Sequence, residues 1–272
     1  YTNTESSAAS DVYKRQLQTY LLIHDDWMDE DHERRGGPAV HYVFERRHGR
    51  KHLGASLGIL AGDLASTFSW EVLLRARFPA ARRDDGLALF VDIQKEVFAG
   101  QQLDLMADAD VERMHDLKTG SYTTRGPAEL GGILADANEA SMAALRAWSA
   151  PLGVAFQLRD DLLGTFETAE ETGKPGEDLR HGKHNAVVAA FGRLGPSKAE
   201  RAAIDAVWGQ ADASDEALSV ALDALGAARA DVEARLTILA RQASAALDAS
   251  PFDDEAKSIL DAVTQQLTER GS

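Results

Sequence analysis

Apolar residues recur along the chain at the three- and four-residue spacing of amphipathic helices, and the alternating pattern typical of strands is nearly absent. Clusters of Gly and Pro at 36–38, 173–176 and 195–196 mark turns between the apolar stretches. The pattern predicts helices at 53–77, 87–107, 117–135, 139–163, 185–193, 198–210, 215–247 and 254–269. The fold class that follows is all-α.

The first sixteen residues differ from the rest of the chain. They carry no helical period, and residues 11–16 look more like junction sequence than the start of a native helix. We interpret 1–16 as a non-native-looking or disordered leader, and 17–272 as a single, N-terminally truncated domain.

Composition narrows the class of protein. A chain of 272 residues, 44% hydrophobic and without cysteine, suits one compact globule that holds no disulfide or thiolate metal site. No apolar run approaches the ~20 residues of a transmembrane segment, and no basic-then-apolar leader opens the chain, so we expect a cytoplasmic protein. The net charge of -15 argues against nucleic acid as a partner. It allows an anionic small substrate, because a few convergent cations dominate the field inside a cleft.

Two acidic clusters carry the candidate chemistry: Asp25, Asp26 and Asp29 in the first, and Asp160 and Asp161 in the second. On a helix, Asp25 and Asp29 would share one face, with Asp26 about 100° around the axis. Buried carboxylates that repel each other need cations, and ligation by carboxylates alone favours a hard ion. We therefore predict one magnesium site shared by the two clusters, with waters and substrate phosphates as the remaining ligands.

Basic side chains accompany the acids. Arg34 and Arg35 follow the first cluster on a Gly-Pro turn, and Lys118 lies on a later predicted helix beside the hydroxyl of Thr119. Residues 172–183 form a glycine-containing, cationic segment that we interpret as a flap. Guanidinium and ammonium groups are the usual partners of phosphate oxygens, so the combination predicts a metal-bridged diphosphate.

These motifs, taken in order, resemble the trans-isoprenyl diphosphate synthases of the polyprenyl synthetase family. Residues 22–31, followed by Arg34 and Arg35, resemble the family's first aspartate-rich motif. An ordered series is far more specific than a lone acidic motif. The further matches are Ala61-Gly62-Asp63, the stretch 100–105, Lys118-Thr119-Gly120, the stretch 156–161 and the flap at 173–183.

The resemblance implies a bundle of about ten helices around a central cavity, with the family's N-terminal helices missing here and a homodimer as the usual assembly. The implied reaction is the condensation of isopentenyl diphosphate with an allylic diphosphate. Its metal ligands would be Asp25, Asp29 and Asp160, with Asp26 and Asp161 completing the clusters around about three Mg²⁺ ions. The allylic diphosphate would contact Arg34, Lys118, Thr119, Gln157 and Lys174, with Lys183 closing over it, and isopentenyl diphosphate would contact Arg35 and Gln18.

The product is expected to be short. Tyr20 lies five residues before Asp25 and Leu21 four before it, so Tyr20 would form an aromatic floor below the first motif. Geranylgeranyl diphosphate is our first choice and farnesyl diphosphate our second, and Tyr20 as an ordinary core residue is the alternative. The second motif ends in Gly164 where the fuller family pattern has aspartate.

Two other functions stay open at this stage. A class I terpene cyclase would share the fold and the first motif, but residues 157–164 do not match the second metal motif of cyclases. A non-catalytic or truncated subunit of a prenyl synthase would also fit, because the family's Gly-Lys-Arg segment before the first motif has no counterpart in this sequence.

Overall fold

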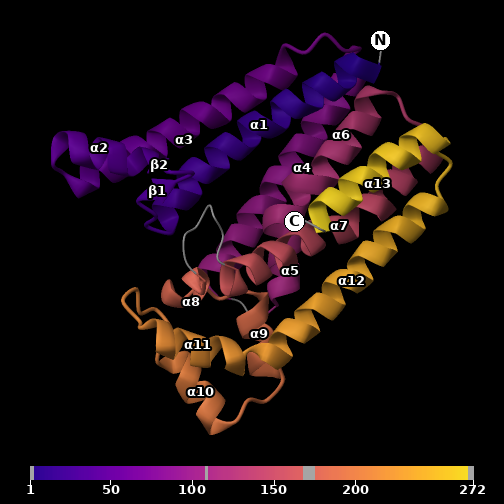
Figure 1. The fold of residues 1–272 in the computed structure, drawn as a ribbon. Coiled ribbons are helices and arrows are strands. Elements are labelled where there is room, and N and C mark those ends of the chain that lie inside the picture. The colour runs from indigo at the N-terminus through magenta and orange to yellow at the C-terminus, as the bar shows by residue number, and fades with distance from the viewer. Residues whose placement is uncertain (1–2, 108–109, 168–174, 269–272) are drawn as a thin grey trace. The chain divides into compact units, whose positions relative to one another are not determined.

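The computed structural model describes residues 3–107, 110–167 and 175–268, and nearly all of their regular structure is helical (Figure 1). The prediction of an all-α fold is confirmed. Backbone contacts divide the chain into two compact units. Unit 1 comprises Tyr1–Ile93 and Gly126–Ala137, and unit 2 comprises Gln94–Arg125 and Asn138–Ser272. A single domain from Leu17 onward stays a prediction.

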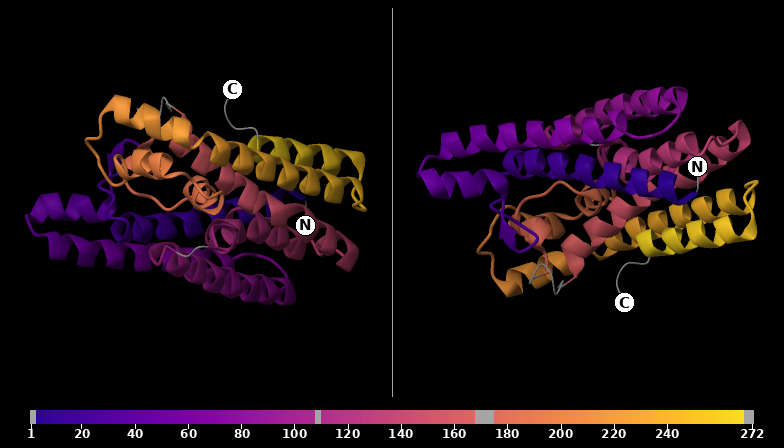
Figure 2. Two further views of the ribbon diagram at one scale, coloured as in Figure 1. Left: turned by 90° about the horizontal axis from the view of Figure 1, so that it is seen from below. Right: turned by 90° about the horizontal axis from the view of Figure 1, so that it is seen from above.

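Unit 1 is built around the pairing of two long helices, α1 (Asn3–Met28) and α3 (Lys51–Leu74), which lie side by side in Figures 1 and 2. Helix α2 (Val40–His48) packs against α3, and α6 (Gly126–Leu134) packs against α1. The largest fully buried side chains of this unit include Leu17, Tyr20 and Phe90. The other elements of unit 1 are β1 (Glu33–Arg34), β2 (Gly37–Pro38) and the first part of α4 (Ala80–Leu105).

Glycines allow α2 to approach α3 closely. Gly54 and Gly58 are buried one turn apart on α3. A Cβ at Gly54 would lie 2.8 Å from the Cβ of Glu45, and a Cβ at Gly58 would lie 2.7 Å from the Cβ of His41. Any larger side chain at these positions would therefore push the two helices apart.

The predicted turn after the first acidic cluster is a two-residue hairpin. Strands β1 and β2 pair Glu33 with Pro38 and Arg34 with Gly37. Arg35 and Gly36 between them have φ angles of 54° and 74°, the left-handed pair that a tight hairpin with the right twist requires. The hairpin fixes the backbone of Arg34 in an extended conformation and leaves Arg35 at the exposed tip.

Helix α3 is an exception to the expectation that no segment could cross a membrane: by length and composition alone, Lys51–Leu74 would suffice. The sequence analysis looked for an uninterrupted apolar run, and Asp63 and Glu71 interrupt this one. Only 22% of the apolar window is buried, and one such helix is weak evidence for a span. A charged side chain such as Asp63 near the middle of the helix would be costly in lipid.

Unit 2 is organised along α7 (Glu139–Phe166), which contacts α12 (Gly226–Asp248) and α13 (Asp254–Thr268); these last two helices also pack on each other (Figures 1 and 2). A π-helix, η1 (Asp116–Arg125), continues α5 (Val111–His115) and packs on α7. The remaining helices are α8 (Glu177–Arg180), α9 (Ala186–Arg193), α10 (Lys198–Asp205) and α11 (Asp215–Ala224).

Local sequence explains where these helices begin. The side chain of Asn138 caps α7 by accepting from the Ser141 amide, and Ser197 forms a reciprocal capping box with Glu200 at the start of α10. The core of unit 2 contains side chains without exposed surface, among them Leu179, Val187 and Val207. Burying each of these apolar side chains contributes about 1.5–3 kcal/mol to stability.

The predicted helices differ from the observed ones in several places. Helix α1 begins at Asn3, within the segment 1–16 that showed no helical period. Helices α2, α5 and α8 were not predicted, because each is short. The predicted helix 117–135 consists of two elements, η1 and α6. The predicted helix 215–247 is interrupted at Leu225, where α11 ends and α12 begins.

Candidate functional site

The first acidic cluster occupies the last turn of α1. The helix ends at Met28, and the Asp29 amide still donates to the carbonyl of Asp25 at 2.8 Å, so Asp25 and Asp29 lie one turn apart. The side chain of Asp25 is 20% exposed, that of Asp26 is almost fully buried, and Asp29 is exposed. The predicted placement of Asp25 and Asp29 on one face therefore follows from the helix that carries them.

Arg34 from the hairpin lies among these carboxylates. Its Nε donates to Asp26 Oδ1 at 2.6 Å, and its Nη2 lies 3.8 Å from Asp25 Oδ2 and 3.6 Å from Asp31 Oδ2. Burial raises the pKa of Asp26, and the hydrogen bond and charge of Arg34 oppose that rise. Arg34 thus balances part of the negative charge of the cluster, and its hydrogen-bond partner there is Asp26.

His24, next to Asp25, contacts α3 and not the carboxylates of the first acidic cluster. Its Nε2 lies 3.1 Å from the carbonyl oxygen of Ile59 and 3.6 Å from Asp63 Oδ1. The Tyr20 ring approaches the His24 ring edge-on, with centroids 6.2 Å apart. Tyr20 is 1% exposed, and burial raises the pKa of its hydroxyl. Leu21 is half-buried, and the chain-length role of Tyr20 and Leu21 stays a prediction.

In unit 2, Lys118 lies on the π-helix and its Nζ donates to Asp104 Oδ2 at 2.5 Å. The two side chains meet because Gly100, one turn before Asp104 on α4, lets the backbone of η1 come very close: a Cβ on Gly100 would lie 2.2 Å from the Lys118 amide nitrogen. The motif that begins at Gly100 and the motif that begins at Lys118 are separate in sequence. They lie together because α4 and η1 pack closely at Gly100.

A hydrogen-bonded chain connects three of the residues singled out from the sequence. The Thr119 hydroxyl donates to Gln157 Oε1 at 3.0 Å, and Gln157 Nε2 donates to Asp161 Oδ1 at 3.1 Å. The second oxygen of Asp161 accepts from the Ala186 amide at 2.8 Å, at the start of α9. His115 Nε2 lies 3.3 Å from the same oxygen. Both carboxylate oxygens of Asp161 are therefore engaged by protein groups.

Burial perturbs both members of the His115 and Asp161 pair. Desolvation raises the pKa of Asp161 to about 6, against the hydrogen bonds from Ala186 and Gln157. Desolvation also lowers the pKa of His115 to about 4. Above pH 6 the pair is an ionised aspartate beside a neutral imidazole, which can donate its Nε2 proton to the carboxylate.

Asp178 and Asn185 were not predicted as site residues from the sequence. Asn185 Nδ2 donates to Asp178 Oδ2 at 2.9 Å and to Thr165 Oγ1 at 3.0 Å, while its own Oδ1 caps α9. A Cβ on Gly164 would lie 2.6 Å from Asp178 Oδ2, so Asp178 fills the space beside the position where the fuller family motif has an aspartate. Asp178 lay inside the predicted flap, and no local spacing marked it.

The remaining predicted residues are placed as follows. Asp160 is half-buried on α7, Gln18 is half-buried on α1, and Lys183 is exposed after α8, where its charge lowers the pKa of Asp178 and Asp161 against the effect of burial. Lys174 lies outside the described residues.

The donor set fits magnesium. Within residues 3–107, 110–167 and 175–268, no three His, Asp or Glu side chains form a group that could hold a metal by themselves. Magnesium keeps several waters and is commonly bound through one or two carboxylates together with substrate phosphates. The Asp25 and Asp29 pair meets that requirement. A metal ion that takes all its ligands from the protein would need more side chains than these two.

The fold is that of known prenyl synthases. A geranylgeranyl pyrophosphate synthase from Corynebacterium glutamicum, solved with isoprenyl diphosphate and magnesium, matches with a TM-score of 0.87 at 32% identity, covering 98% of this chain and 80% of that one. A geranylgeranyl pyrophosphate synthetase from Pyrococcus horikoshii Ot3 matches with a TM-score of 0.84 at 27% identity, covering 98% and 80%.

The sequence places the chain in a family. The polyprenyl synthetase model matches residues 2–225, and the chain belongs to this family. A short chain isoprenyl diphosphate synthase of Methanocaldococcus jannaschii is 31% identical over 77% of this chain, and one of Methanothermobacter thermautotrophicus is 31% identical over 68%. The matched region spans 62% and 56% of those two relatives.

Proposed function

We propose that the protein is a magnesium-dependent short-chain prenyl transferase, which condenses isopentenyl diphosphate with an allylic diphosphate and releases diphosphate. The observation that carries the proposal is the Asp25 and Asp29 pair at the C-terminal end of α1, one helical turn apart, with Arg34 close to Asp25. Family membership and the likeness to a synthase solved with isoprenyl diphosphate and magnesium support it. Geranylgeranyl diphosphate is the proposed product, with farnesyl diphosphate second.

We assign the metal-binding role to Asp25, Asp29 and Asp160. Bound magnesium would neutralise the negative charge that grows on the departing diphosphate. Asp26 holds Arg34 in place through its short hydrogen bond. Asp161 is assigned a positioning role, because its oxygens already accept from Gln157 and Ala186.

The cationic and polar side chains have distinct tasks in this proposal. Arg34 and Lys118 bind the allylic diphosphate, and each is held before binding by a carboxylate, Asp26 or Asp104. Thr119 donates to the phosphate oxygens after its hydrogen bond to Gln157 opens, and Gln157 donates through the second hydrogen of Nε2, whose first is bonded to Asp161. Lys174 is a further contact of the allylic diphosphate, Lys183 closes over the leaving group, and Arg35 and Gln18 bind isopentenyl diphosphate. No protein nucleophile is needed, since the charged groups act by electrostatic stabilisation.

Tyr20 is proposed to limit product length. It is fully buried on α1, more than one turn before Asp25, and its ring is held by contact with His24. Replacing Tyr20 with Ala should lengthen the product by one or more isoprene units, because each additional buried methylene contributes roughly 0.8 kcal/mol. Product chromatography with the folded variant tests this; an unchanged product distribution would assign Tyr20 to the core alone.

The central experiment incubates the protein with labelled isopentenyl diphosphate and each allylic primer in turn. A labelled prenyl diphosphate is expected, and hydrocarbon products would instead identify a terpene cyclase. Asp25→Ala should abolish turnover while the far-ultraviolet circular dichroism stays that of a helical protein. The matched control is Asp85→Ala, which removes an exposed carboxylate from α4. Near-normal turnover of Asp25→Ala would refute the metal assignment.

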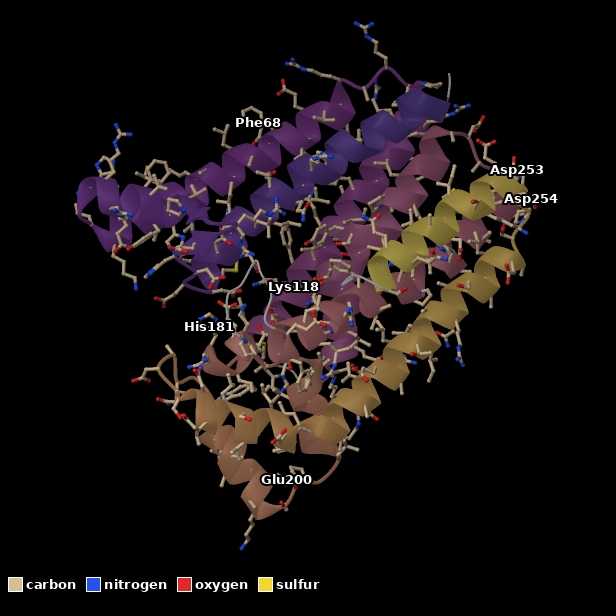
Figure 3. All side chains as sticks on the ribbon, in the orientation of Figure 1. Phe68, Lys118, His181, Glu200, Asp253 and Asp254 are labelled. Carbon is tan, nitrogen blue, oxygen red and sulfur yellow. The ribbon has the colours of Figure 1, made fainter. Side chains whose placement is uncertain are left out.

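We also propose that the protein acts in the cytoplasm as a homodimer that covers the outer face of α3. Leu60, Leu64 and Phe68 follow each other at four-residue spacing on that helix and are 61%, 55% and 47% exposed. Figure 3 shows Phe68 pointing away from α1. Three large apolar side chains in one row are an unusual surface for a monomer and suit a second copy of the same helix.

A further inference from the structure

At Gly62, α1 and α3 approach so closely that an added side chain would displace the His24 ring. A Cβ on Gly62 would lie 2.1 Å from His24 Nε2, 2.3 Å from Cδ2 and 2.9 Å from Cε1. The imidazole therefore occupies the volume that any residue other than glycine would need at this position of α3. The other two glycines of α3, Gly54 and Gly58, face residues of α2 and not a ring of α1.

The His24 ring is fixed on two further sides. Its Nε2 lies 3.1 Å from the Ile59 carbonyl oxygen, and because a carbonyl can only accept, Nε2 carries the proton and donates. The Tyr20 ring, one turn earlier on α1, forms a T-shaped pair with the imidazole. His24 is thus attached to the backbone of α3 and not to the acids that follow it.

This attachment sets the rotation of the last turn of α1. His24 precedes Asp25 by one position, which is about 100° around the helix axis, and Asp29 follows Asp25 by one turn. If the His24 ring leaves its seat on Gly62, α1 can rotate or shift along α3, and both carboxylates change direction. A displacement of a fraction of an ångström matters for ligands that must share one ion.

We propose that the His24 ring seated on Gly62 is a positioning device for the first acidic cluster: it holds Asp25 and Asp29 at the orientation in which they bind a divalent cation. The inference rests on the proposed metal role of these two aspartates. His24 touches neither metal nor substrate, and Gly62 acts only by leaving room for it.

The experiment measures binding of Mn²⁺ in the presence of inorganic diphosphate, from the electron paramagnetic resonance signal of free Mn²⁺. Gly62→Ala and His24→Ala should each weaken Mn²⁺ binding by about 10- to 100-fold, the range found for residues that orient metal ligands. The double variant should bind no worse than His24→Ala alone, because without the ring the new methyl group displaces nothing. His24→Gln, which keeps a donor for the Ile59 carbonyl, should recover part of the affinity.

The matched control is Gly131→Ala in α6 of the same unit, where an added Cβ has no neighbour within 4 Å; it should bind Mn²⁺ as the parent does. Parental affinity in both Gly62→Ala and His24→Ala would overturn the inference, provided that Asp25→Ala loses binding. If Asp25→Ala also binds as the parent does, the metal assignment itself has failed. If Gly62→Ala does not fold, the two His24 variants still test the inference. It requires that His24→Ala lose Mn²⁺ affinity and that His24→Gln recover part of it.

Discussion

At the scale of single residues, the charged groups proposed to bind diphosphate are already held by protein partners. Arg34 is bound to Asp26, and Lys118 to Asp104. A side chain held in this way loses less conformational entropy when the substrate arrives, but the substrate must compete with a carboxylate. In the proposed function, substrate binding is therefore an exchange of partners at both cations.

Lys118 is expected to contribute directly to transition-state stabilisation. Lys118→Ala should lower kcat/KM for the allylic diphosphate, because one charge-assisted contact to the leaving group is lost. The decrease should correspond to a loss of transition-state stabilisation on the order of 2–4 kcal/mol. Steady-state kinetics with saturating isopentenyl diphosphate measure this. Lys198→Ala, an exposed lysine at the start of α10, serves as the control. A parental kcat/KM in Lys118→Ala would exclude the role.

The buried His115 should contribute a loss of stability in acid, opposite in sign to the contribution of Asp161, whose raised pKa favours the folded state as pH falls. Its folded pKa of about 4 lies below the ordinary value of 6.5, so between these values the unfolded chain binds more protons and stability falls as pH falls. At pH 5 this amounts to about 2 kcal/mol relative to pH 7.5. His115→Gln keeps a donor for Asp161 but does not titrate.

Urea unfolding at several pH values tests this prediction. The free energy of unfolding of His115→Gln should fall less than that of the parent between pH 7.5 and 5. Equal losses would mean that His115 titrates in the folded protein near its ordinary pKa.

At the scale of secondary structure, helix pairs in both units depend on glycines at points of closest approach. In unit 2 a Cβ on Gly153 of α7 would lie 2.3 Å from the Cα of Gly120 on η1 and 3.0 Å from Thr124 Oγ1. Here the obstacle is backbone, which cannot turn aside as a flexible side chain can. The π-helix that carries Lys118 and Thr119 is therefore placed against α7 by a contact between two glycines.

Gly153→Ala should destabilise unit 2 by about 1–3 kcal/mol or more, because the two backbones must separate. The matched control is Gly192→Ala in α9, where a Cβ meets nothing within 4 Å. That control should be neutral or more stable by up to about 1 kcal/mol, since alanine is the better helix former. Urea unfolding followed by circular dichroism compares the two variants. A free energy of unfolding of Gly153→Ala equal to that of the parent would show that η1 and α7 can separate at little cost.

At the scale of the whole molecule, the outer face of α3 is the feature that a monomer leaves unexplained. If a second copy covers it, Phe68→Asp should weaken dimerisation by at least about 100-fold, because an apolar side chain is lost and a charge is buried in each copy. Sedimentation velocity over a concentration series measures the change. Leu194→Asp, at a residue that is 50% exposed in unit 2, is the control. An unchanged sedimentation coefficient in Phe68→Asp would place the interface elsewhere.

The sequence by itself determined the all-α class, most helix positions and the family. Helices such as α7, α9 and α13 were predicted closely, because their apolar period and their capping residues are local signals. The acidic clusters could be found for the same reason: the spacing of Asp25 and Asp29 has meaning on any helix. Their proposed chemistry followed from residue type and from the ordered motifs.

Only the tertiary structure decided which groups each of these side chains meets. The His24 ring against Gly62, the contacts of Asp161 with Ala186 and His115, and Asp178 beside Gly164 each join residues that are 14 to 46 positions apart. No local pattern records such contacts, since they depend on how closely two helices pack and on which side chain is absent at the crossing. A hydrophobic pattern gives glycine no weight, yet at these crossings the absence of a side chain allows the two elements to approach this closely.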